Sequence, residues 1–447
     1  MFRRRKSMVG LVFLCVMMLM IVGCGETNED AKVETESEET SQVDKGEKVE
    51  EVEEIVIRIA GFGGVDQAIV EDLLAEFINP QVAKEGITVR YEPVAGDYLA
   101  SLINSLSAGT AADLFYMDSF WAQNLIGAGQ VQPLDSFLAA SDILRKEDII
   151  PALIDGFSYD GKVYGIAKDF NTLPIIYNKD LFDVANVDYP NEKDTWETLE
   201  EKLAKVVAAF DGEVTGITLQ PEYARMGVFA YAAGWEPFAN GKTNLLDPAF
   251  KEAFAWYTGL NDKGLGAMPA DLGQGWGGGA FATGNVAVTV EGSWIIGFLR
   301  DEAPNLRYGA SLLPLNPRTN ERGNFIYTVA WGINAESENK DAAFKVMEAL
   351  TSPEAQQWVL ERGLAIPSRI ELADNPYFKE DSQEARTNKI VFQGATSGNV
   401  RLFSFKEYGG EWMDPINVAL AEVMTGQKTV EEALKTAQER LDIVMGE

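Results

Sequence analysis

The sequence contains no histidine, and it has only two cysteines among its 447 residues. The absence of histidine removes the commonest general base, the usual hydrolytic triads and most zinc sites. A glycosidase can act with two carboxylates, so an enzyme is disfavoured and not excluded. Basic residues are also scarce: 38 lysines and arginines stand against 69 aspartates and glutamates, for a net charge of −31. Nucleic-acid binding needs a basic surface, so we expect no nucleic-acid partner.

Both cysteines lie in an N-terminal segment that predicts a lipoprotein signal peptide over residues 1–23. Arg3 to Lys6 is basic, Met8 to Val22 is apolar, and Ile21 to Cys24 matches the bacterial lipobox. A transmembrane anchor is the alternative, but the apolar run is short for a span of about 20 residues. If Cys15 is removed and Cys24 is acylated, no thiol remains for a disulfide or a metal. We expect the lipid on Cys24 to hold the protein at the outer face of the bacterial cell membrane.

The next segment, Gly25 to Glu54, carries thirteen carboxylates and three lysines, with almost no large apolar side chain. Such a segment cannot bury enough surface to fold, so residues 24–53 are predicted to be a disordered acidic tether. About 390 residues follow it, which exceeds one ordinary hydrophobic core. We therefore expect two lobes.

Hydrophobic periodicity after the tether alternates between strand and helix, which predicts doubly wound α/β lobes. The expected strands cover Glu54 to Ala60, Ile87 to Tyr91, Ala112 to Tyr116, Val163 to Ala167, Leu173 to Tyr177, Gly216 to Leu219, Asn285 to Glu291, Leu306 to Leu312 and Asn324 to Trp331. The expected helices include one starting near Asp66 and those over Tyr98 to Leu106, Trp196 to Phe210, Phe250 to Leu260, Asn339 to Leu350 and Gly426 to Met445.

Aromatic and acidic residues follow several of these strands. Phe62 comes after the first, Asp118 and Trp121 after the third, and Trp331 ends a later one. Ligands of open α/β sheets lie at the carboxyl ends of the strands. These side chains are therefore candidates for a binding site, although each alone is equally compatible with the core.

The stretch FATGNVAVTVEGSW, Phe281 to Trp294, is the centre of this prediction. Its strand is broken by Gly292-Ser293, which should project Trp294 from the sheet edge into a cleft. The alternative is that Trp294 is a core residue. Just before it, Gly273 to Gly279 is too rich in glycine for a regular element, so Trp276 is expected either in a cleft or on a mobile surface loop.

The pattern F-x-x-G-x-x-A-x-x-x-x-G-x-W at Phe281 to Trp294 resembles the signature of the family 1 extracellular solute-binding proteins, the sugar-capturing subunits of ABC importers. The runs KVYGIAKDFNTLPIIYNKDLF, QPEY and WGINAESENKDAAFKVMEALTSPEAQ resemble that family in the same order. The resemblance implies a periplasmic-binding-protein type II-like fold with crossing segments near Lys168, Tyr327 and Pro367 to Asn375. Its lobes would comprise residues 54–168 plus 327–370 and residues 169–326 plus 371–447, with ligand between them.

A sugar offers apolar C–H faces and many hydroxyls, which suit aromatic rings and carboxylate acceptors. The resemblance implies that Asp169 hydrogen-bonds the sugar and that Glu222 and Tyr223 supply an acid and a stacking ring. The candidate ligand-binding residues are Phe62, Asp118, Trp121, Asp169, Glu222, Tyr223, Trp276, Trp294 and Trp331.

We expect a monomer without cofactor, metal or catalytic residue, which works with the permease subunits of an ABC transporter. Two alternatives stay open from the sequence. One is an anchored glycan hydrolase that uses Asp169 and Glu222 as its carboxylate pair. The other is a subunit that presents ligand to a membrane sensor.

Replacing Cys24 by alanine tests the lipid anchor. Cys24→Ala should release the protein into the medium, or leave it as an uncleaved precursor, because the acceptor thiol is gone. Cell fractionation and mass spectrometry of the N-terminal peptide measure this. A free, unlipidated Cys24 in the wild-type protein would contradict the prediction.

Overall fold

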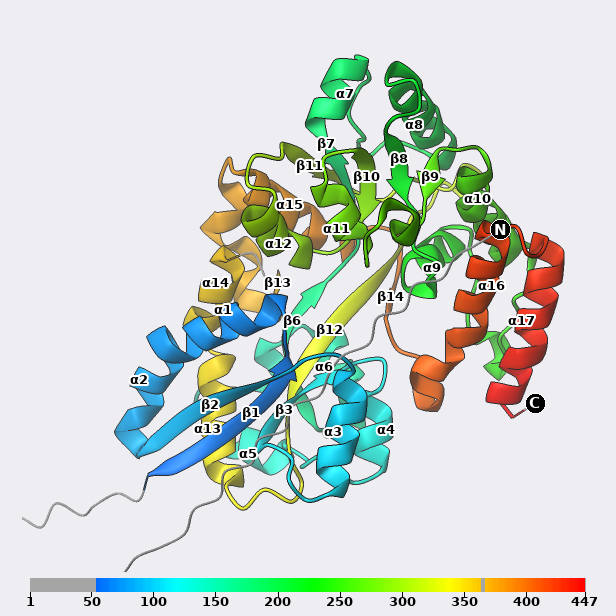
Figure 1. Ribbon diagram of the computed structural model, residues 1–447. Coiled ribbons are helices and arrows are strands. Elements are labelled where there is room, and N and C mark those ends of the chain that lie inside the picture. Colours follow the sequence, from blue (N-terminus) through cyan, green and yellow to red (C-terminus); the bar gives the residue numbers. More distant parts are fainter. Residues whose placement is uncertain (1–53, 363–365, 447) are drawn as a thin grey trace, which may run out of the picture. The chain divides into compact units, whose positions relative to one another are not determined.

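The computed structural model describes residues 54–362 and 366–446 (Figure 1). The predicted signal peptide, the lipidated Cys24 and the acidic tether lie outside these residues. Within the described ranges, no helix combines the length and the apolar character needed to cross a bilayer.

The described strands form two large sheets and one hairpin (Figure 1). The seven-stranded sheet has the order β13-β6-β12-β3-β1-β2, with β14 paired to β12, and its strands are β1 (Ile55–Phe62), β2 (Ile87–Val94), β3 (Leu114–Asp118), β6 (Gly165–Asn171), β12 (Gly323–Ile333), β13 (Ile366–Pro367) and β14 (Asn399–Leu402). The five-stranded sheet has the order β11-β7-β10-β8-β9, with β7 (Ile175–Asn178), β8 (Thr215–Thr218), β9 (Gly266–Ala267), β10 (Val286–Val290) and β11 (Tyr308–Ser311). The hairpin pairs β4 (Ser158–Tyr159) with β5 (Lys162–Val163).

Helices connect and cover these strands. They are α1 (Val65–Leu73), α2 (Asn79–Val82), α3 (Tyr98–Ser107), α4 (Ala122–Gly127), α5 (Asp135–Ala140), α6 (Pro151–Gly156), α7 (Lys179–Ala185), α8 (Trp196–Ala209), α9 (Tyr223–Ala232), α10 (Pro248–Asp262), α11 (Gly277–Ala282), α12 (Trp294–Glu302), α13 (Lys340–Leu350), α14 (Pro353–Glu361), α15 (Gln383–Gly394), α16 (Asp414–Met424) and α17 (Val430–Val444), with a short 3₁₀ segment η8 (Lys406–Trp412) before α16.

The first sheet begins as the doubly wound unit that the sequence predicts. Strand β1 pairs in parallel with both β2 and β3, so the carboxyl ends of β1 and β3 lie at one edge of the sheet. Strand β12 then runs antiparallel to β3 and β6, which makes the sheet mixed. Helix α8 begins with a capping box, since the Thr195 hydroxyl accepts a hydrogen bond from the Thr198 backbone N–H at 3.3 Å.

Two separate hydrophobic cores define two lobes. Lobe 1 is built on the seven-stranded sheet, with Ile57, Phe115 and Trp331 in its core. Lobe 2 is built on the five-stranded sheet, with Val288 and Phe325 in its core. The two-lobed α/β fold expected from the sequence is confirmed. The exact lobe boundaries stay a prediction.

The chain passes between the lobes along ordered strands. Strand β6 lies in the first sheet and β7 in the second, so the chain crosses between Asn171 and Ile175. At this crossing the Asn324 side chain accepts a hydrogen bond from Leu173 N at 3.0 Å and donates one to Leu173 O at 2.9 Å. Asn324 thereby satisfies both backbone polar groups of a fully buried residue.

Two local predictions are wrong. Lys168 to Asn171 was expected between two strands, but it belongs to β6, because a bulge keeps the pairing with β12: Val329 lies opposite Asp169 and Ala330 opposite Ala167. The glycine-rich segment contains helix α11, where a loop was expected. Its glycines serve close packing, since a Cβ on Gly277 would lie 2.8 Å from Glu291 Oε1.

Asn324→Ala tests the tie between the crossing strands. The variant leaves the N–H and C=O of buried Leu173 without partners, at about 1–3 kcal/mol each, so we expect a loss of about 2–6 kcal/mol in unfolding free energy. Urea denaturation measures it. Asn305→Ala is the control, because Asn305 is exposed. Equal stabilities of the two variants would contradict the role of Asn324.

Candidate functional site

A pocket of about 240 Å³ lies where the two lobes meet. Lobe 1 contributes residues from the ends of β1 and β3 and from β6, the crossing strand β12 lines its floor, and lobe 2 contributes the first residue of α12. The lining residues are Phe62, Asp66, Asp118, Lys168, Asp169, Asn171, Trp294, Tyr327, Thr328 and Val329. The pocket therefore contains four of the predicted binding residues: Phe62, Asp118, Asp169 and Trp294.

Trp294 reaches the pocket from the break after β10, as the sequence predicts. The ring lies against the Cα of Gly292, where a Cβ would be only 2.4 Å from it, so glycine is needed there. The residue also begins helix α12, which was not predicted from the sequence. Its half-buried ring meets Tyr327 edge-on, with 5.7 Å between the ring centroids and 87° between the planes.

Phe62 is the aromatic side chain on the lobe 1 side of the pocket. It is the last residue of β1 and packs edge-on against the Tyr98 and Tyr116 rings, at centroid distances of 4.9 and 5.2 Å. Its carbonyl accepts a hydrogen bond of 2.6 Å from Tyr91 Oη. The ring is therefore held from behind by packing on tyrosines, as Trp294 is held on the other side.

Three carboxylates and one ammonium group lie together in this pocket. Lys168 forms an ion pair with Asp169 and lies 3.8 Å from Asp66 Oδ2. The same ammonium lies 4.8 Å from the centre of the Tyr116 ring. With Asp118 included, the formal charge of the cluster is negative, so it favours hydroxyl donors over anionic ligands.

Desolvation raises the pKa values of two carboxylates of this cluster, Asp118 and Asp169. Burial raises the pKa of Asp118 to about 7, although Phe120 N donates to its Oδ1 at 3.3 Å. Burial also raises the pKa of Asp169, against the opposing effect of Lys168. Near neutral pH, Asp118 can therefore donate as well as accept a hydrogen bond.

Asn171 joins the pocket to the break before Trp294. Its Oδ1 accepts hydrogen bonds from Ser293 N at 2.8 Å and Ser293 Oγ at 2.5 Å. This contact fixes the orientation of the Asn171 amide. Its NH₂ group, which can donate a hydrogen bond, therefore belongs to a fixed side chain that lines the pocket.

Three predicted aromatic residues are buried behind the pocket or away from it. Trp121 and Trp331 are 3% and 2% exposed and belong to the lobe 1 core. Tyr223 is 0% exposed in the lobe 2 core, where its ring packs edge-on against Trp412 at 5.0 Å. The expectation that these rings face the ligand pocket is therefore corrected: all three are core residues in this structure.

Glu222 and Trp276 are also placed outside the pocket. Glu222 is exposed at the N-cap of α9 and does not line the pocket. Trp276 packs edge-on against Phe298 at 5.0 Å, so it is neither in the pocket nor on a loop without packing partners. Asp169 and Glu222, the proposed hydrolase pair, are thus not brought into one pocket.

Four further lining residues, Asp66, Lys168, Asn171 and Tyr327, were not among the binding residues predicted from the sequence. The sequence could have indicated Lys168 and Asn171, because both lie within two residues of Asp169 in the crossing segment. Asp66 lies in the first turn of α1, shortly after the end of β1. No local pattern marks Tyr327, which faces the pocket because of the pairing of β12.

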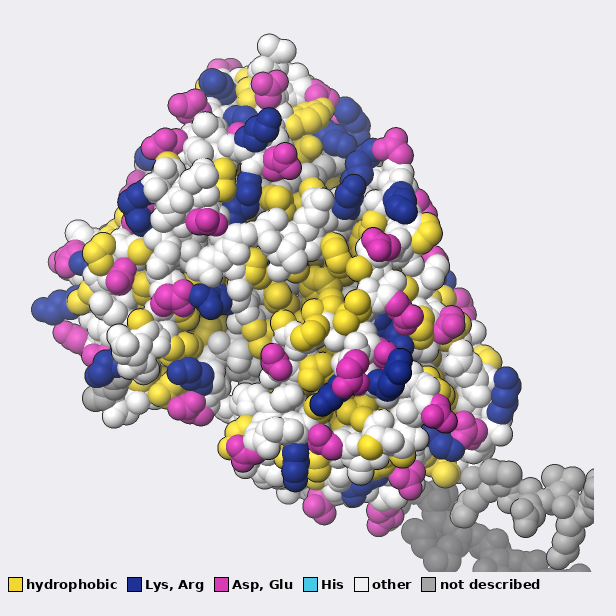
Figure 2. All heavy atoms as spheres, turned by 180° about the vertical axis from the view of Figure 1, so that it is seen from behind, with side chains coloured by type: hydrophobic (Ala, Val, Ile, Leu, Met, Phe, Trp, Pro, Cys, Tyr) yellow, Lys and Arg dark blue, Asp and Glu magenta, His cyan; other side chains and the backbone are white. Residues whose placement is uncertain are grey.

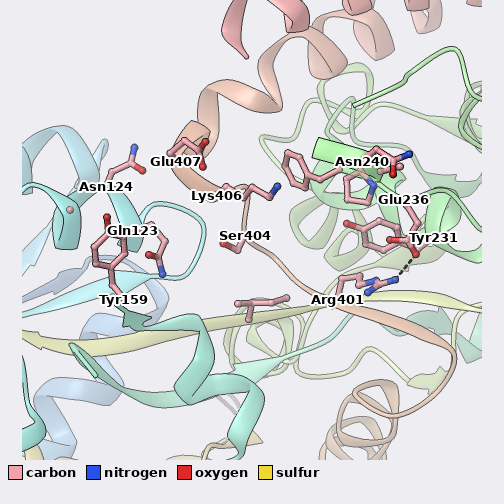
Figure 3. Close-up of a pocket in the computed structure, with 15 residues that line it drawn as sticks. Gln123, Asn124, Tyr159, Tyr231, Glu236, Asn240, Arg401, Ser404, Lys406 and Glu407 are labelled. Carbon is pink, nitrogen blue, oxygen red and sulfur yellow. Dashed lines mark hydrogen bonds and ion pairs between the residues drawn. The ribbon is translucent and has the colours of Figure 1, made fainter. Parts of the chain in front are cut away.

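A larger pocket of about 1100 Å³ lies elsewhere and contains none of the predicted residues (Figure 3). Gln123, Asn124 and Tyr159 line it from lobe 1, and Tyr231, Glu236 and Asn240 line it from lobe 2, with Arg401 to Glu407 between them. Arg401 pairs with Glu236, and Lys406 lies 4.5 Å from the centre of the Phe238 ring. We call this the β14 pocket.

Figure 2 shows acidic and basic side chains interspersed on the face that it presents. Within residues 54–362 and 366–446, no three acidic or cysteine side chains gather as a metal site.

Comparison with known proteins matches residues 76–387 to the family model described as bacterial extracellular solute-binding protein. A binding protein of Brucella abortus strain 2308 is 26% identical over 80% of this chain and 86% of its own. The maltooligosaccharide ABC transporter solute-binding lipoprotein of Streptococcus pneumoniae R6 is 23% identical over 98% of this chain and 96% of its own. An ABC substrate-binding protein of Listeria monocytogenes, solved with cycloalternan, superimposes with a TM-score of 0.80 at 23% identity, covering 88% of this chain and 100% of that one.

Asp118 gives the pocket a pH dependence that can be measured without ligand. Its folded pKa of about 7 exceeds the unfolded value of 3.8, so its protonated form favours the fold, and this stabilisation is lost as pH rises from about 4 to 7. Because the carboxyl is partly exposed, we expect about 1–3 kcal/mol. Urea unfolding of wild type and Asp118→Asn across this range should show less loss in the variant. Parallel pH profiles would refute the assignment.

Proposed function

Because the chain belongs to the bacterial extracellular solute-binding protein family, we propose that it captures a sugar or oligosaccharide between its lobes and delivers it to an ABC-transporter permease. The resemblance read from the sequence is thereby confirmed at the level of the family and its two-lobed fold. Relatives named for maltooligosaccharide and a fold neighbour solved with cycloalternan support a carbohydrate ligand.

The observation that carries the proposal is the pairing of two aromatic rings with carboxylates in one interlobe pocket. Trp294 and Phe62 can cover the C–H faces of a pyranose, while Asp118 and Asp169 accept its hydroxyl hydrogen bonds. The amide of Asn171 adds a donor. This set suits a neutral polyhydroxylated ligand better than an acidic one, because carboxylates outnumber the single ammonium of Lys168.

The size of the pocket supports a binding cycle with lobe movement. At about 240 Å³ it is smaller than the roughly 300–1,000 Å³ of most ligand sites. An oligosaccharide therefore enters when the lobes separate and is enclosed when they approach. Its differential affinity for the closed arrangement drives the shift, and the residues of β6 and β12 at the crossing are the proposed hinge.

The family consists of binding proteins, and we propose that this chain also binds without turnover. The two carboxylates considered for a hydrolase, Asp169 and Glu222, do not line the same pocket, since Glu222 lies outside it. Asp118 and Asp169 do share the pocket, so product formation has to be measured. A ligand-presenting role toward a membrane sensor would use the same pocket and differ only in the partner.

The remaining parts of the proposal concern the partner and the membrane. The lipobox at Cys24 and the lipoprotein named in Streptococcus pneumoniae support a lipid anchor on this chain. A monomer that docks on permease subunits fits the two-lobed fold, and the lobe boundaries near Lys168, Tyr327 and Pro367 to Asn375 remain part of this proposal.

Calorimetric titration with a panel of mono- and oligosaccharides tests the function. We expect at least one saccharide to bind the wild type, and Trp294→Ala to weaken that binding by about 2–4 kcal/mol, because it removes a stacking ring and its buried area. Unfolding free energy should fall less, by about 1–2 kcal/mol, since the ring is only half buried.

Two outcomes would contradict this. If Trp294→Ala collapses the apo stability while its folded fraction binds normally, Trp294 is a packing residue. If chromatography detects protein-dependent shortening of the bound saccharide, the hydrolase reading replaces binding alone. Trp276→Ala is the matched control, because Trp276 is a half-buried tryptophan of the same lobe that does not line the pocket.

A further inference from the structure

Glu291 is a buried carboxylate directly behind the proposed ligand pocket. It follows β10, is 0% exposed and does not line the pocket. A buried carboxylate is costly unless several donors surround it. Glu291 lies three residues before Trp294, and its carboxylate contacts the Trp294 indole.

Three side-chain donors surround this carboxylate. Gln220 Nε2 donates to Oε1 at 2.9 Å, while an Arg225 terminal nitrogen and Trp294 Nε1 donate to Oε2 at 2.7 and 3.0 Å. Gln220 is fixed in turn, since its Oε1 accepts from Gly277 N at 3.1 Å. The carboxylate therefore connects the turn after β8, helices α9 and α11 and the start of α12.

The same groups restrain the Trp294 ring on several sides. The indole N–H is held by Glu291, and the Arg225 guanidinium carbon lies 5.6 Å from the ring centre. Tyr327 meets the ring edge-on, and Gly292 lies against it. Rotation of the ring away from the pocket would break the indole hydrogen bond and leave a buried acceptor with one donor fewer.

We propose that Glu291 is a positioning residue, which fixes the Trp294 indole through its N–H in the orientation that receives ligand, with Arg225 holding the carboxylate in place. Resting on the proposed function, this assigns part of the ligand affinity to a residue that never touches ligand. A ring that is already oriented loses less conformational entropy when it binds, so the gain appears as affinity.

A double-mutant cycle with Glu291→Gln and Trp294→Phe tests the proposal. Glutamine keeps the size of glutamate but cannot accept from all three donors, and phenylalanine keeps a ring but lacks the N–H. For the saccharide that binds wild type best, Glu291→Gln should lower affinity about tenfold in the tryptophan background and less than about twofold in the Trp294→Phe background. Equal losses in both backgrounds would overturn the proposal.

A spectroscopic measurement supplies a readout that needs no ligand. The chain has nine tryptophans, and the indole ¹H–¹⁵N signal of Trp294 is the one lost in Trp294→Phe. In Glu291→Gln this signal should shift and its hydrogen exchange should accelerate. An unchanged signal would show that Glu291 does not hold the indole. If no saccharide binds the wild type, the proposed function fails, but the indole signal still shows whether Glu291 holds the Trp294 N–H.

Two further variants keep the test interpretable. Glu291→Gln leaves Arg225 buried without its counter-charge, so if it does not fold, the paired variant Glu291→Gln/Arg225→Gln removes both charges and should give the same indole change. Glu252→Gln is the matched control, because it breaks a carboxylate–arginine contact with Arg318 in the same lobe, away from the pocket lining. A shift of the Trp294 signal in this control would count against the assignment.

Discussion

The rest of the structure depends on strand β12, because this one strand of eleven residues contributes side chains to both cores. Phe325 packs in lobe 2 and Trp331 in lobe 1, with Tyr327 between them at the pocket. A strand in two cores must keep its backbone hydrogen bonds throughout, so β14 pairs with its first part and β3 with its last. At the neighbouring crossing, the Asn324 side chain forms the hydrogen bonds that the backbone of Leu173 needs. The pocket lies where β12 passes from one core to the other, so any relative movement of the lobes must reshape it.

Charge is used in two different ways around this point. In the pocket, three carboxylates share one ammonium group, so part of their hydrogen-bonding capacity is unused. Burial raises the pKa of two of them, Asp118 and Asp169. Behind the pocket, Glu291 receives three donors and its capacity is taken up by protein groups. A carboxylate that still lacks partners can bind ligand hydroxyls, whereas a satisfied one can only hold its neighbours. In the proposed function, Asp118 and Asp169 therefore bind ligand hydroxyls, while Glu291 positions Trp294.

The sequence was sufficient for the order of most strands and helices and for the family, because hydrophobic periodicity and short motifs are local. Four of its candidate residues line the interlobe pocket: Phe62 and Asp118 at the ends of parallel strands, Trp294 after a strand break, and Asp169 from the family resemblance. It could not distinguish these from Trp121, Tyr223 and Trp331, which follow or end strands in the same way but are buried by elements distant in sequence. Helix α11 was missed because its glycines are required by packing on Glu291 and Trp276, which a local pattern does not reveal.

Cavity volume alone would have selected the β14 pocket, which is over four times larger than the interlobe pocket. The two are separated by β14 and the residues after it: Phe403 packs against Tyr327 with 4.5 Å between ring centroids, while its neighbours Leu402 and Ser404 line the β14 pocket. Leu402 and Ser404 thus line the β14 pocket, while Phe403 between them packs against a residue that lines the interlobe pocket. The smaller pocket is the better candidate because one aromatic ring from each lobe and three carboxylates of lobe 1 converge there, and the chemistry of the lining decides what can be bound.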